Sequence, residues 1–429
     1  MNVRQHINRT PGTSADSLAA PSDAKARVEA DSSGLRRSRV LFLQATEPAN
    51  YPPLIHASML MTEAGWEVTF LSAPISGHEV ALPSHPRVTI RAISSRRSHV
   101  ISKVAYSSYT ATAAGLALRM RPDVVYASDP LGAGPGLLAA CLTGAQLIYH
   151  EHDSPQPGML HPILMRLRAA ATRWAQLVVF PNGERARIAQ NELNFTDDRL
   201  HIVWNVPRRA EVAACTAPAE PPLIVYYHGS ISPERLPQSV AFAVRRMAGR
   251  ARLRIAGYEA PGAQGYVRQL VGSDTEMAAD NPVEYIGVVP QRTDLLMQAA
   301  RAHVGLALMP CQSNDFNMRH MTGASNKPFD YMANGLALLV SDLPDWKAMF
   351  IDPGYGMACN PTDVDSISMA LGWFIDHPEA RRAMAARGRN KIETEWNYDK
   401  QFRAVLESLE SIKTPGRPWK TPDTHQPNP

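Results

Sequence analysis

Residues 322–341, TGASNKPFDYMANGLALLVS, contain a loop, a short helix and an apolar strand in immediate succession. Pro328 falls in the first helical turn, where its missing N–H costs nothing, and Ser325 or Asn326 can cap that turn. Gly335 stands at the usual position of a left-handed residue after a helix. The loop follows another apolar run, so its polar residues lie beyond the carboxyl end of a predicted strand, where ligands bind in open α/β sheets.

The same alternation of apolar runs and helical spacing extends to both sides of this stretch. Short alternating strands and helices are typical of βαβ units and of a parallel sheet covered on both faces. The expected strands are 39–45, 66–73, 88–93, 121–129, 145–153, 175–181, 201–207, 223–230, 251–257, 283–289, 303–310 and 335–341. Residues 208–222 interrupt the pattern with prolines and small residues, which indicates a linker.

A chain of 429 residues is too long for one ordinary core, so two domains are expected. The predicted fold class is α/β, with two doubly wound Rossmann-like domains that face a central cleft. The predicted boundaries are a disordered arm (1–38), an N-terminal domain (39–208), a linker (209–222), a C-terminal domain (223–395), a crossover helix (396–412) and a disordered tail (413–429).

Composition and charge exclude several classes of protein. A net charge of +4 without a dense basic run or interleaved aromatics argues against a nucleic-acid module. The four cysteines are scattered with no CxxC pair, so neither a disulfide framework nor a zinc site is expected. The sequence shows no apolar run long enough to span a membrane and no apolar core of a signal peptide. These features predict a cytoplasmic protein.

The C-terminal half offers a candidate anion site. Gly229 and Ser230 end an apolar strand, and Arg235 lies just beyond, where backbone amides and a guanidinium can bind phosphate. Lys327 and Asp330 lie one turn apart, so that the lysine can meet a phosphate while the carboxylate accepts two ribose hydroxyls. The alternatives are an exposed surface arginine and an ordinary i,i+3 ion pair.

The N-terminal half has a polar strand end of its own. The run from His150 to Asp153 brings four titratable residues together, and His152 can orient a hydroxyl. Metal binding is a competing interpretation, but a third ligand is not apparent. A histidine that bonds a loop carbonyl is the structural alternative. Asp129 ends another strand before LGAGPG (131–136), whose spacing is not that of a dinucleotide fingerprint.

Taken in order, these segments resemble the retaining GT-B glycosyltransferases of family 4, from about residue 39 to 410. The resemblance rests on YPPLIHASMLMTEAGWEVTFLS, PDVVYASD, LIYHEHD, IVWNVP, YYHGSISPER, SNKPFDYMANGLALLVSDLP and TEWNYDKQFRAVLESL. The chain departs from the family at three positions: Thr322 replaces the first glutamate of a spaced pair, Asp330 replaces the second, and Ser230 stands where arginine is frequent.

The resemblance implies an enzyme that moves a sugar from a nucleoside-diphosphate sugar to a glycan, glycolipid or small acceptor. The anomeric configuration would be retained, with the diphosphate taking the acceptor proton, and without metal or cofactor. The implied catalytic residues are His152, Arg235 and Lys327. The implied donor-binding residues are Gly229, Ser230, Arg235, Gly323, Ala324, Ser325, Lys327 and Asp330, with backbone amides of 323–325 on the diphosphate. The acceptor-side residues are Asp129, His150 and Asp153.

Two further expectations concern partners. Basic residues of the N-terminal half, together with the apolar segment 159–176, form a candidate face for the inner membrane surface and a lipid-linked acceptor. They are Arg91, Arg96, Arg97, Lys103, Arg119 and Arg121. A solvated helix face is the alternative.

The alternative functions are a nucleotide-sugar epimerase on the same fold and a non-catalytic partner subunit, for which Thr322 and Ser230 are the support.

Overall fold

The computed structural model describes residues 37–73, 82, 84–93, 102–156, 158–218, 220–272 and 281–412, all within one compact unit. Apart from its last two residues, the expected arm lies outside the described residues. The expected tail, Arg96 and Arg97 lie outside them as well. In the described part of the chain, no helix is both long and apolar enough to cross a membrane.

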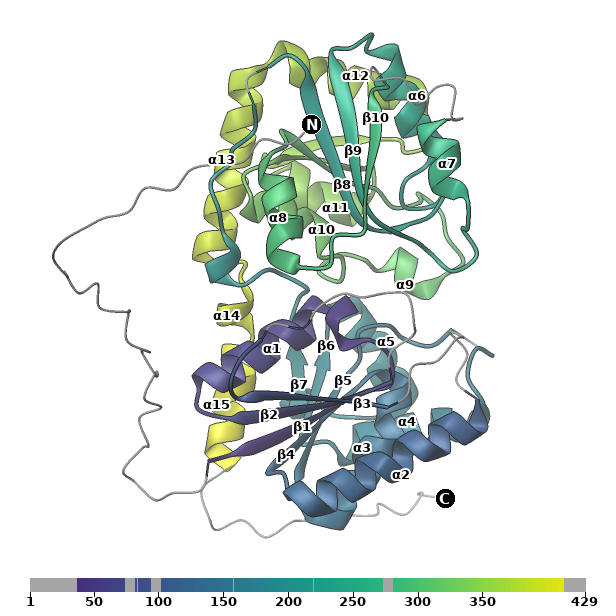
Figure 1. Ribbon diagram of the computed structural model, residues 1–429, viewed down its shortest axis with the longest axis vertical. Coiled ribbons are helices and arrows are strands. Elements are labelled where there is room, and N and C mark those ends of the chain that lie inside the picture. The colour runs from purple at the N-terminus through teal and green to yellow at the C-terminus, as the bar shows by residue number, and fades with distance from the viewer. Residues whose placement is uncertain are drawn as a thin grey trace, which may run out of the picture. The chain divides into compact units, whose positions relative to one another are not determined.

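The N-terminal half contains a sheet of seven described strands, all of whose pairs are parallel, in the order β3-β2-β1-β4-β5-β6-β7 (Figure 1). Its strands are β1 (Arg39–Gln44), β2 (Glu67–Ser72), β3 (Val88–Ala92), β4 (Val124–Ser128), β5 (Gln146–His150), β6 (Leu177–Phe180) and β7 (Leu200–Ile202). Its helices are α1 (Pro52–Glu63), α2 (Lys103–Met120), α3 (Asp129–Thr143), α4 (Pro162–Trp174) and α5 (Gly183–Leu193). The central strands are apolar and buried, as expected for a parallel sheet covered on both faces.

The C-terminal half repeats this design with six described strands, again all parallel, in the order β10-β9-β8-β11-β12-β13. The strands are β8 (Leu223–Ile231), β9 (Ala251–Glu259), β10 (Val283–Gly287), β11 (Val304–Ala307), β12 (Ala337–Ser341) and β13 (Gly356–Cys359). The helices are α6 (Gln238–Arg246), α7 (Tyr266–Val271), α8 (Arg292–Ala300), α9 (Phe316–Arg319), α10 (Lys327–Ala333), α11 (Pro344–Trp346), α12 (Val364–Asp376) and α13 (Pro378–Thr394). The predicted α/β class with two doubly wound sheets is confirmed.

The end of the described chain returns to the N-terminal sheet. After α13, the helices α14 (Tyr398–Gln401) and α15 (Arg403–Ile412) follow and lie beside the N-terminal sheet (Figure 1). Tyr398 of α14 packs against His56 of α1, with ring centres 5.2 Å apart. The segment 208–222 connects the two sheets and contains the short 3-10 helix η3 (Arg209–Glu211).

Several strand ends differ from the prediction. The strand expected at 201–207 stops at Ile202, because Trp204 and Asn205 donate their backbone N–H groups to Gln401 and to the carbonyl of Gly323 instead of a neighbouring strand. The strand expected at 121–129 ends at Ser128, and Asp129 already begins α3. Both differences place residues from strand ends into contact with other parts of the chain.

Residues 322–341 form the predicted loop, helix and strand. Pro328 lies in the first turn of α10, and Gly335 follows the helix with φ +73°. The cap differs from the prediction, because the side chain of Asn326 makes no capping bond. Its amide instead donates to the Asp330 carboxylate at 2.9 Å.

Candidate active site

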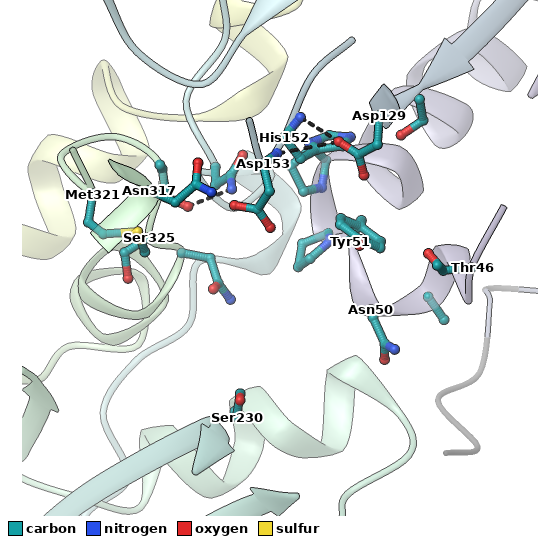
Figure 2. A pocket seen from close by; sticks show the side chains of 18 of the residues that line it. Thr46, Asn50, Tyr51, Asp129, His152, Asp153, Ser230, Asn317, Met321 and Ser325 are labelled. Carbon is teal, nitrogen blue, oxygen red and sulfur yellow. Dashed lines mark hydrogen bonds between the residues drawn. The ribbon is translucent and has the colours of Figure 1, made fainter. Parts of the chain in front are cut away.

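Both halves of the chain line one cavity of about 680 Å³, which lies beyond the carboxyl ends of the central strands. The N-terminal half contributes loops after β1, β4 and β5, and the C-terminal half contributes the ends of β8 and β9, the segment after β10 and the segment 315–327. Figure 2 shows side chains from both halves around this space, namely Thr46, Asn50, Tyr51, Asp129, His152, Asp153, Ser230, Asn317, Met321 and Ser325.

Two facing glycines form the floor on the C-terminal side. Gly229 of β8 pairs with Gly257 of β9, and both have positive φ angles, +105° and +134°. A Cβ atom at Gly257 would lie 1.9 Å from the carbonyl oxygen of Gly229, so this position accepts only glycine. A Cβ at Gly229 would lie 3.4 Å from Cε of Lys327. Because Gly229 has no side chain, the side chain of Lys327 can lie directly against the end of β8.

Lys327 and Arg235 place positive charge on this wall. Lys327 is only 7% exposed, and its Nζ lies 5.5 Å from the ring centre of Tyr227. Burial and the nearby Arg235 lower the pKa of Lys327 to about 7. Within the described residues, neither cation forms an ion pair with a carboxylate, and the guanidinium of Arg235 makes its one hydrogen-bond contact with Sδ of Met318, at 3.8 Å. Two neighbouring cations without a paired carboxylate suit an anionic group such as a phosphate.

Asp330, which was expected to accept ribose hydroxyls, does not face the cavity. Its side chain is fully buried and does not line the cavity. Its Oδ1 accepts from Nη2 of Arg292 at 2.7 Å, and its Oδ2 accepts from Nη1 of Arg292 at 3.2 Å and from Asn326. The predicted role of Asp330 is therefore corrected: the carboxylate is occupied by Arg292, which itself lines the cavity.

The loop 323–325 also differs from the expectation. The backbone amides of Ala324 and Ser325 both donate to the carbonyl of Met321 at 2.9 Å, so neither is available to a diphosphate. Gly323 does not line the cavity and packs against Pro181 and Trp204 of the N-terminal half. Ala324 and Ser325 do line it. Ser325 presents a buried hydroxyl without a hydrogen-bond partner among the described residues.

His152 lies on the N-terminal wall of the cavity and is 4% exposed. Neither ring nitrogen has a hydrogen-bond partner within the described part of the chain. The ring lies beside Tyr51, with ring centres 5.2 Å apart. Burial and the charge of Arg185 lower the pKa of His152 to about 3, so the ring is neutral at physiological pH. A neutral imidazole with open nitrogens suits contact with a hydroxyl group.

Asp129 fixes the backbone of His152. It has φ +59° and its Oδ1 accepts the backbone N–H groups of His152 at 2.8 Å and Asp153 at 3.3 Å. Burial and the charge of Asp153 raise the pKa of Asp129 to about 8. Asp153 lines the cavity with a side chain that is 66% exposed. Asp129 therefore holds in place the backbone of the segment after β5 that carries His152.

His150 does not line the cavity. It is fully buried behind His152, with the two ring centres 3.8 Å apart, and its Nδ1 lies 2.6 Å from the hydroxyl of Tyr126. The expected direct contact of His150 with an acceptor is therefore corrected, because its position allows it only to support the ring of His152.

Several lining residues were missed from the sequence. Gln44 and Ser128 end β1 and β4, and each has a buried side-chain oxygen without a partner among the described residues. His228, near the end of β8, has its Nε2 3.5 Å from Oδ2 of Asp330, and neither ring nitrogen makes a hydrogen bond among the described residues. Burial lowers the pKa of His228 to about 4. All three follow the strand-end rule that singled out His152, so the same rule would have found them. Arg292 is the first residue of α8 and does not follow directly on a strand, so the strand-end rule would not have identified it.

Arg185 of α5 joins the two halves beside the cavity. Its buried guanidinium donates to the carbonyls of His152 at 2.5 Å, Asn317 at 2.9 Å and His320 at 2.9 Å. Asn182 adds two bonds to carbonyls of the same C-terminal segment, and Asn205 adds one more. These hydrogen bonds therefore join the two halves next to residues that line the cavity.

No group of three or more His, Cys, Asp or Glu side chains close enough to hold a metal ion occurs among the described residues. Thr322, which stands where the family has glutamate, donates its hydroxyl to the carboxylate of Asp345, and neither residue lines the cavity.

Comparison with known families agrees with the fold. Residues 56–206 match the model of Glycosyltransferase Family 4, and residues 237–407 match a model described as glycosyl transferase-like. Solved structures with similar folds include Anabaena HepE in complex with UDP and glucose (TM-score 0.63, 13% identity, 87% of this chain and 100% of that chain). Sucrose-phosphate synthase from Thermosynechococcus elongatus has a TM-score of 0.66 at 13% identity, covering 88% and 100%. A UDP-N-acetylglucosamine 2-epimerase has a TM-score of 0.55 at 15% identity, covering 88% and 97%.

Two curated relatives share one description, UDP-N-acetylglucosamine--N-acetylmuramyl-(pentapeptide) pyrophosphoryl-undecaprenol N-acetylglucosamine transferase. The one from Xanthomonas euvesicatoria pv. vesicatoria is 31% identical over 212 residues, which are 47% of this chain and 44% of the relative. The one from Aeromonas hydrophila subsp. hydrophila is 27% identical over 360 residues, which are 79% of this chain and 88% of the relative. The chain thus spans less than half of the first relative and most of the second.

Proposed function

We propose that this chain, which has the GT-B fold and matches glycosyltransferase family models in both halves, transfers a sugar from a UDP-sugar to a hydroxyl of a lipid-linked acceptor. The observation that carries the proposal is the cavity itself. Lys327 and Arg235 lie on one wall without a carboxylate partner among the described residues, and His152 lies on the other with both ring nitrogens open.

The cations are proposed to stabilise the leaving diphosphate. Departure of UDP breaks the bond between the anomeric carbon and the phosphate oxygen and leaves negative charge on that oxygen. Lys327 and Arg235 supply positive charge where this charge develops, and their fixed position means that little reorganisation is needed. Because the pKa of free Lys327 is about 7, an incoming diphosphate also favours its charged form.

The acceptor side is proposed to hold a neutral hydroxyl. His152 contacts the transferred sugar or the attacking hydroxyl, and Asp129 keeps its backbone in place. We propose retention of the anomeric configuration, in which the acceptor oxygen bonds to the anomeric carbon on the face that UDP leaves. The departing diphosphate oxygen takes the acceptor proton, so this route requires no protein nucleophile.

Uridine and a lipid-linked acceptor are proposed from the relatives. The names of the curated relatives specify a UDP-sugar donor and an undecaprenol-linked acceptor, and HepE was solved with UDP. Met159 lines the cavity and is 67% exposed. Ile163 is 56% exposed on the following helix beside the exposed Arg166. We propose that this edge contacts the membrane surface that carries the acceptor.

Membrane contact has its own test. Sedimentation with vesicles of 30% anionic lipid should pellet the wild type, whereas Met159→Ser with Ile163→Ser should stay in the supernatant. Met369→Ser, at an exposed apolar residue of the C-terminal half, serves as the control. Equal sedimentation of all three proteins would refute the proposed contact without affecting the donor site.

The donor site is tested by titration calorimetry and thermal shift with UDP, GDP, ADP and dTDP. UDP should bind, and UDP at about 100 times its dissociation constant should add roughly 2.7 kcal/mol of stability. Arg235→Ala and Lys327→Ala should lose this binding, whereas Arg246→Ala, at an exposed arginine paired with Asp365, should keep it. The anomeric proton coupling of the product then decides between retention and inversion.

Each result separates one part of the proposal. If none of the four nucleotides binds at millimolar concentration, the donor site is refuted. If UDP binds but no sugar reaches any acceptor, a non-catalytic partner subunit becomes the better description. If the sugar is epimerised without an acceptor, the epimerase alternative replaces transfer.

A further inference from the structure

Four ionisable side chains from four separate segments form a continuous chain of contacts. His56 of α1 lies with Nε2 3.0 Å from Glu211 of η3. Glu211 accepts from Arg292 of α8 at 2.6 Å (Nε) and 3.0 Å (Nη2). Arg292 then donates to Asp330 of α10 at 2.7 Å and 3.2 Å. The chain of contacts thus runs from the N-terminal half, through the segment that connects the sheets, to the cavity wall.

The contacts are well shielded from water. The side chains of His56 and Asp330 are 2% and 0% exposed, and those of Arg292 and Glu211 are 12% and 20% exposed. Burial opposes the ionisation of Glu211, but Arg292 and His56 outweigh it and hold its pKa well below the usual value. Removing one member of a buried ion pair leaves the partner uncompensated, which costs far more than loss of an exposed pair.

Arg292 is the member that reaches the cavity. A guanidinium has five N–H donors, and its contacts with Glu211 and Asp330 use four, leaving one on Nη1. Because two carboxylates already offset its charge, Arg292 adds little positive potential for a phosphate. The remaining N–H suits an uncharged oxygen, such as a hydroxyl of the donor.

We propose that Glu211 is a positioning residue that couples the placement of the two halves to donor binding, by holding Arg292 at the cavity wall against an uncharged oxygen of the donor. The inference rests on the proposed donor site. Glu211 belongs to the connecting segment and touches His56 on one side and Arg292 on the other. A shift of the N-terminal half that draws Glu211 away therefore releases Arg292 to its remaining partner, Asp330, and weakens donor binding.

The test compares Glu211→Gln and His56→Gln with Glu284→Gln, which removes one charge from an exposed pair with Arg254 outside the cavity. The readouts are the Kd for UDP and for a UDP-sugar by calorimetry, the donor KM, the acceptor KM and kcat. Glu211→Gln should raise the Kd and KM for the donor about tenfold, while kcat and acceptor KM change less than threefold. His56→Gln should raise donor Kd about threefold, and Glu284→Gln should leave it unchanged.

The remaining outcomes also decide the question. A lower melting temperature with unchanged donor Kd in both Glu211→Gln and His56→Gln means a purely structural role and overturns the inference. If Glu211→Gln does not fold, the donor Kd of His56→Gln decides the question, because this variant keeps the charges of Glu211, Arg292 and Asp330. If Arg292→Lys binds UDP as the wild type does, Arg292 makes no donor contact and the inference fails. If the wild type itself binds none of the four nucleotides, the donor site fails first and the inference falls with it.

Discussion

The two walls of the cavity differ in charge. Among the described lining residues, the N-terminal wall carries the carboxyl groups of Asp129 and Asp153 and has no lysine or arginine. Among the described lining residues, the C-terminal wall carries Arg235 and Lys327, which pair with no carboxylate, and Arg292, whose charge Glu211 and Asp330 offset, together with one lining carboxylate, Asp315. A diphosphate requires cations, whereas a hydroxyl is held by neutral polar groups. The unequal distribution indicates that substitutions on the two walls should separate donor binding from turnover.

The largest effect is expected on the cationic wall. Lys327→Ala should lower kcat/KM for the UDP-sugar about 1000-fold, because it removes charge where the leaving diphosphate develops it. Initial rates of UDP release over a range of donor concentrations measure this. The matched control Arg246→Ala should stay within twofold of wild type, since Arg246 lies at the exposed end of α6. A loss below tenfold for Lys327→Ala would mean that the charge difference between the walls has no catalytic meaning.

On the opposite wall, His152→Ala should lower kcat about 100-fold and leave the Kd of UDP unchanged, because the ring contacts the sugar or acceptor and not the nucleotide. Calorimetry and steady-state rates on the same preparation provide both values. His201→Ala, on β7 and outside the cavity, controls for loss of a histidine. If the UDP affinity falls as far as kcat, the separation of the walls is wrong.

The charge of the cationic wall also predicts a pH dependence. The pKa of free Lys327 is about 7, and a bound diphosphate raises it, so UDP affinity is full below pH 7 and falls as the pH rises above it. The Kd should increase by up to about tenfold per pH unit until the pKa of the complex is reached. Calorimetry at pH 6, 7, 8 and 9 at constant ionic strength tests this. Lys327→Arg should flatten the profile, and an equal slope in both proteins would assign it to another group.

The smallest effect is expected from Asp153→Asn. Asp153 is exposed, so its charge is screened, although it helps to raise the pKa of Asp129. The substitution should lower the pKa of Asp129 and change the rate at pH 7.5 by less than about fivefold. If ionisation of Asp129, which holds the backbone of His152, sets one limb of the pH–rate profile, that limb should lie at lower pH in the variant than in the wild type. An unmoved limb would assign it elsewhere.

The architecture was predictable because it depends on local patterns. Apolar runs of strand length alternate with helices, and the rule that ligands lie beyond strand ends pointed to His152, Arg235 and Lys327, all of which line the cavity. Asp330 was misjudged because its partner Arg292 lies 38 residues earlier, on another helix. A pairing between distant segments leaves no periodic trace in a single sequence.

The amides of the 323–325 loop were misjudged for a related reason. A backbone N–H carries no sequence signature, and whether it is free depends on the turn that the chain adopts. Here the amides of Ala324 and Ser325 turn back onto Met321. Local sequence thus identified which segment reaches the cavity, but the groups that the segment presents were decided by its fold.

The joint between the halves has a consequence for sequence change. Asn182, Arg185 and Asn205 make five hydrogen bonds to backbone carbonyls in the segment 317–324. Every amino acid offers the same carbonyl, so the side chains of this segment can diversify while the joint keeps its bonds. In a chimera that carries a 317–324 segment of equal length from another protein, these five hydrogen bonds should still form, provided that Asn182, Arg185 and Asn205 are kept. The contact between the halves therefore depends on the backbone conformation of the segment 317–324 and leaves its side chains free to change in evolution.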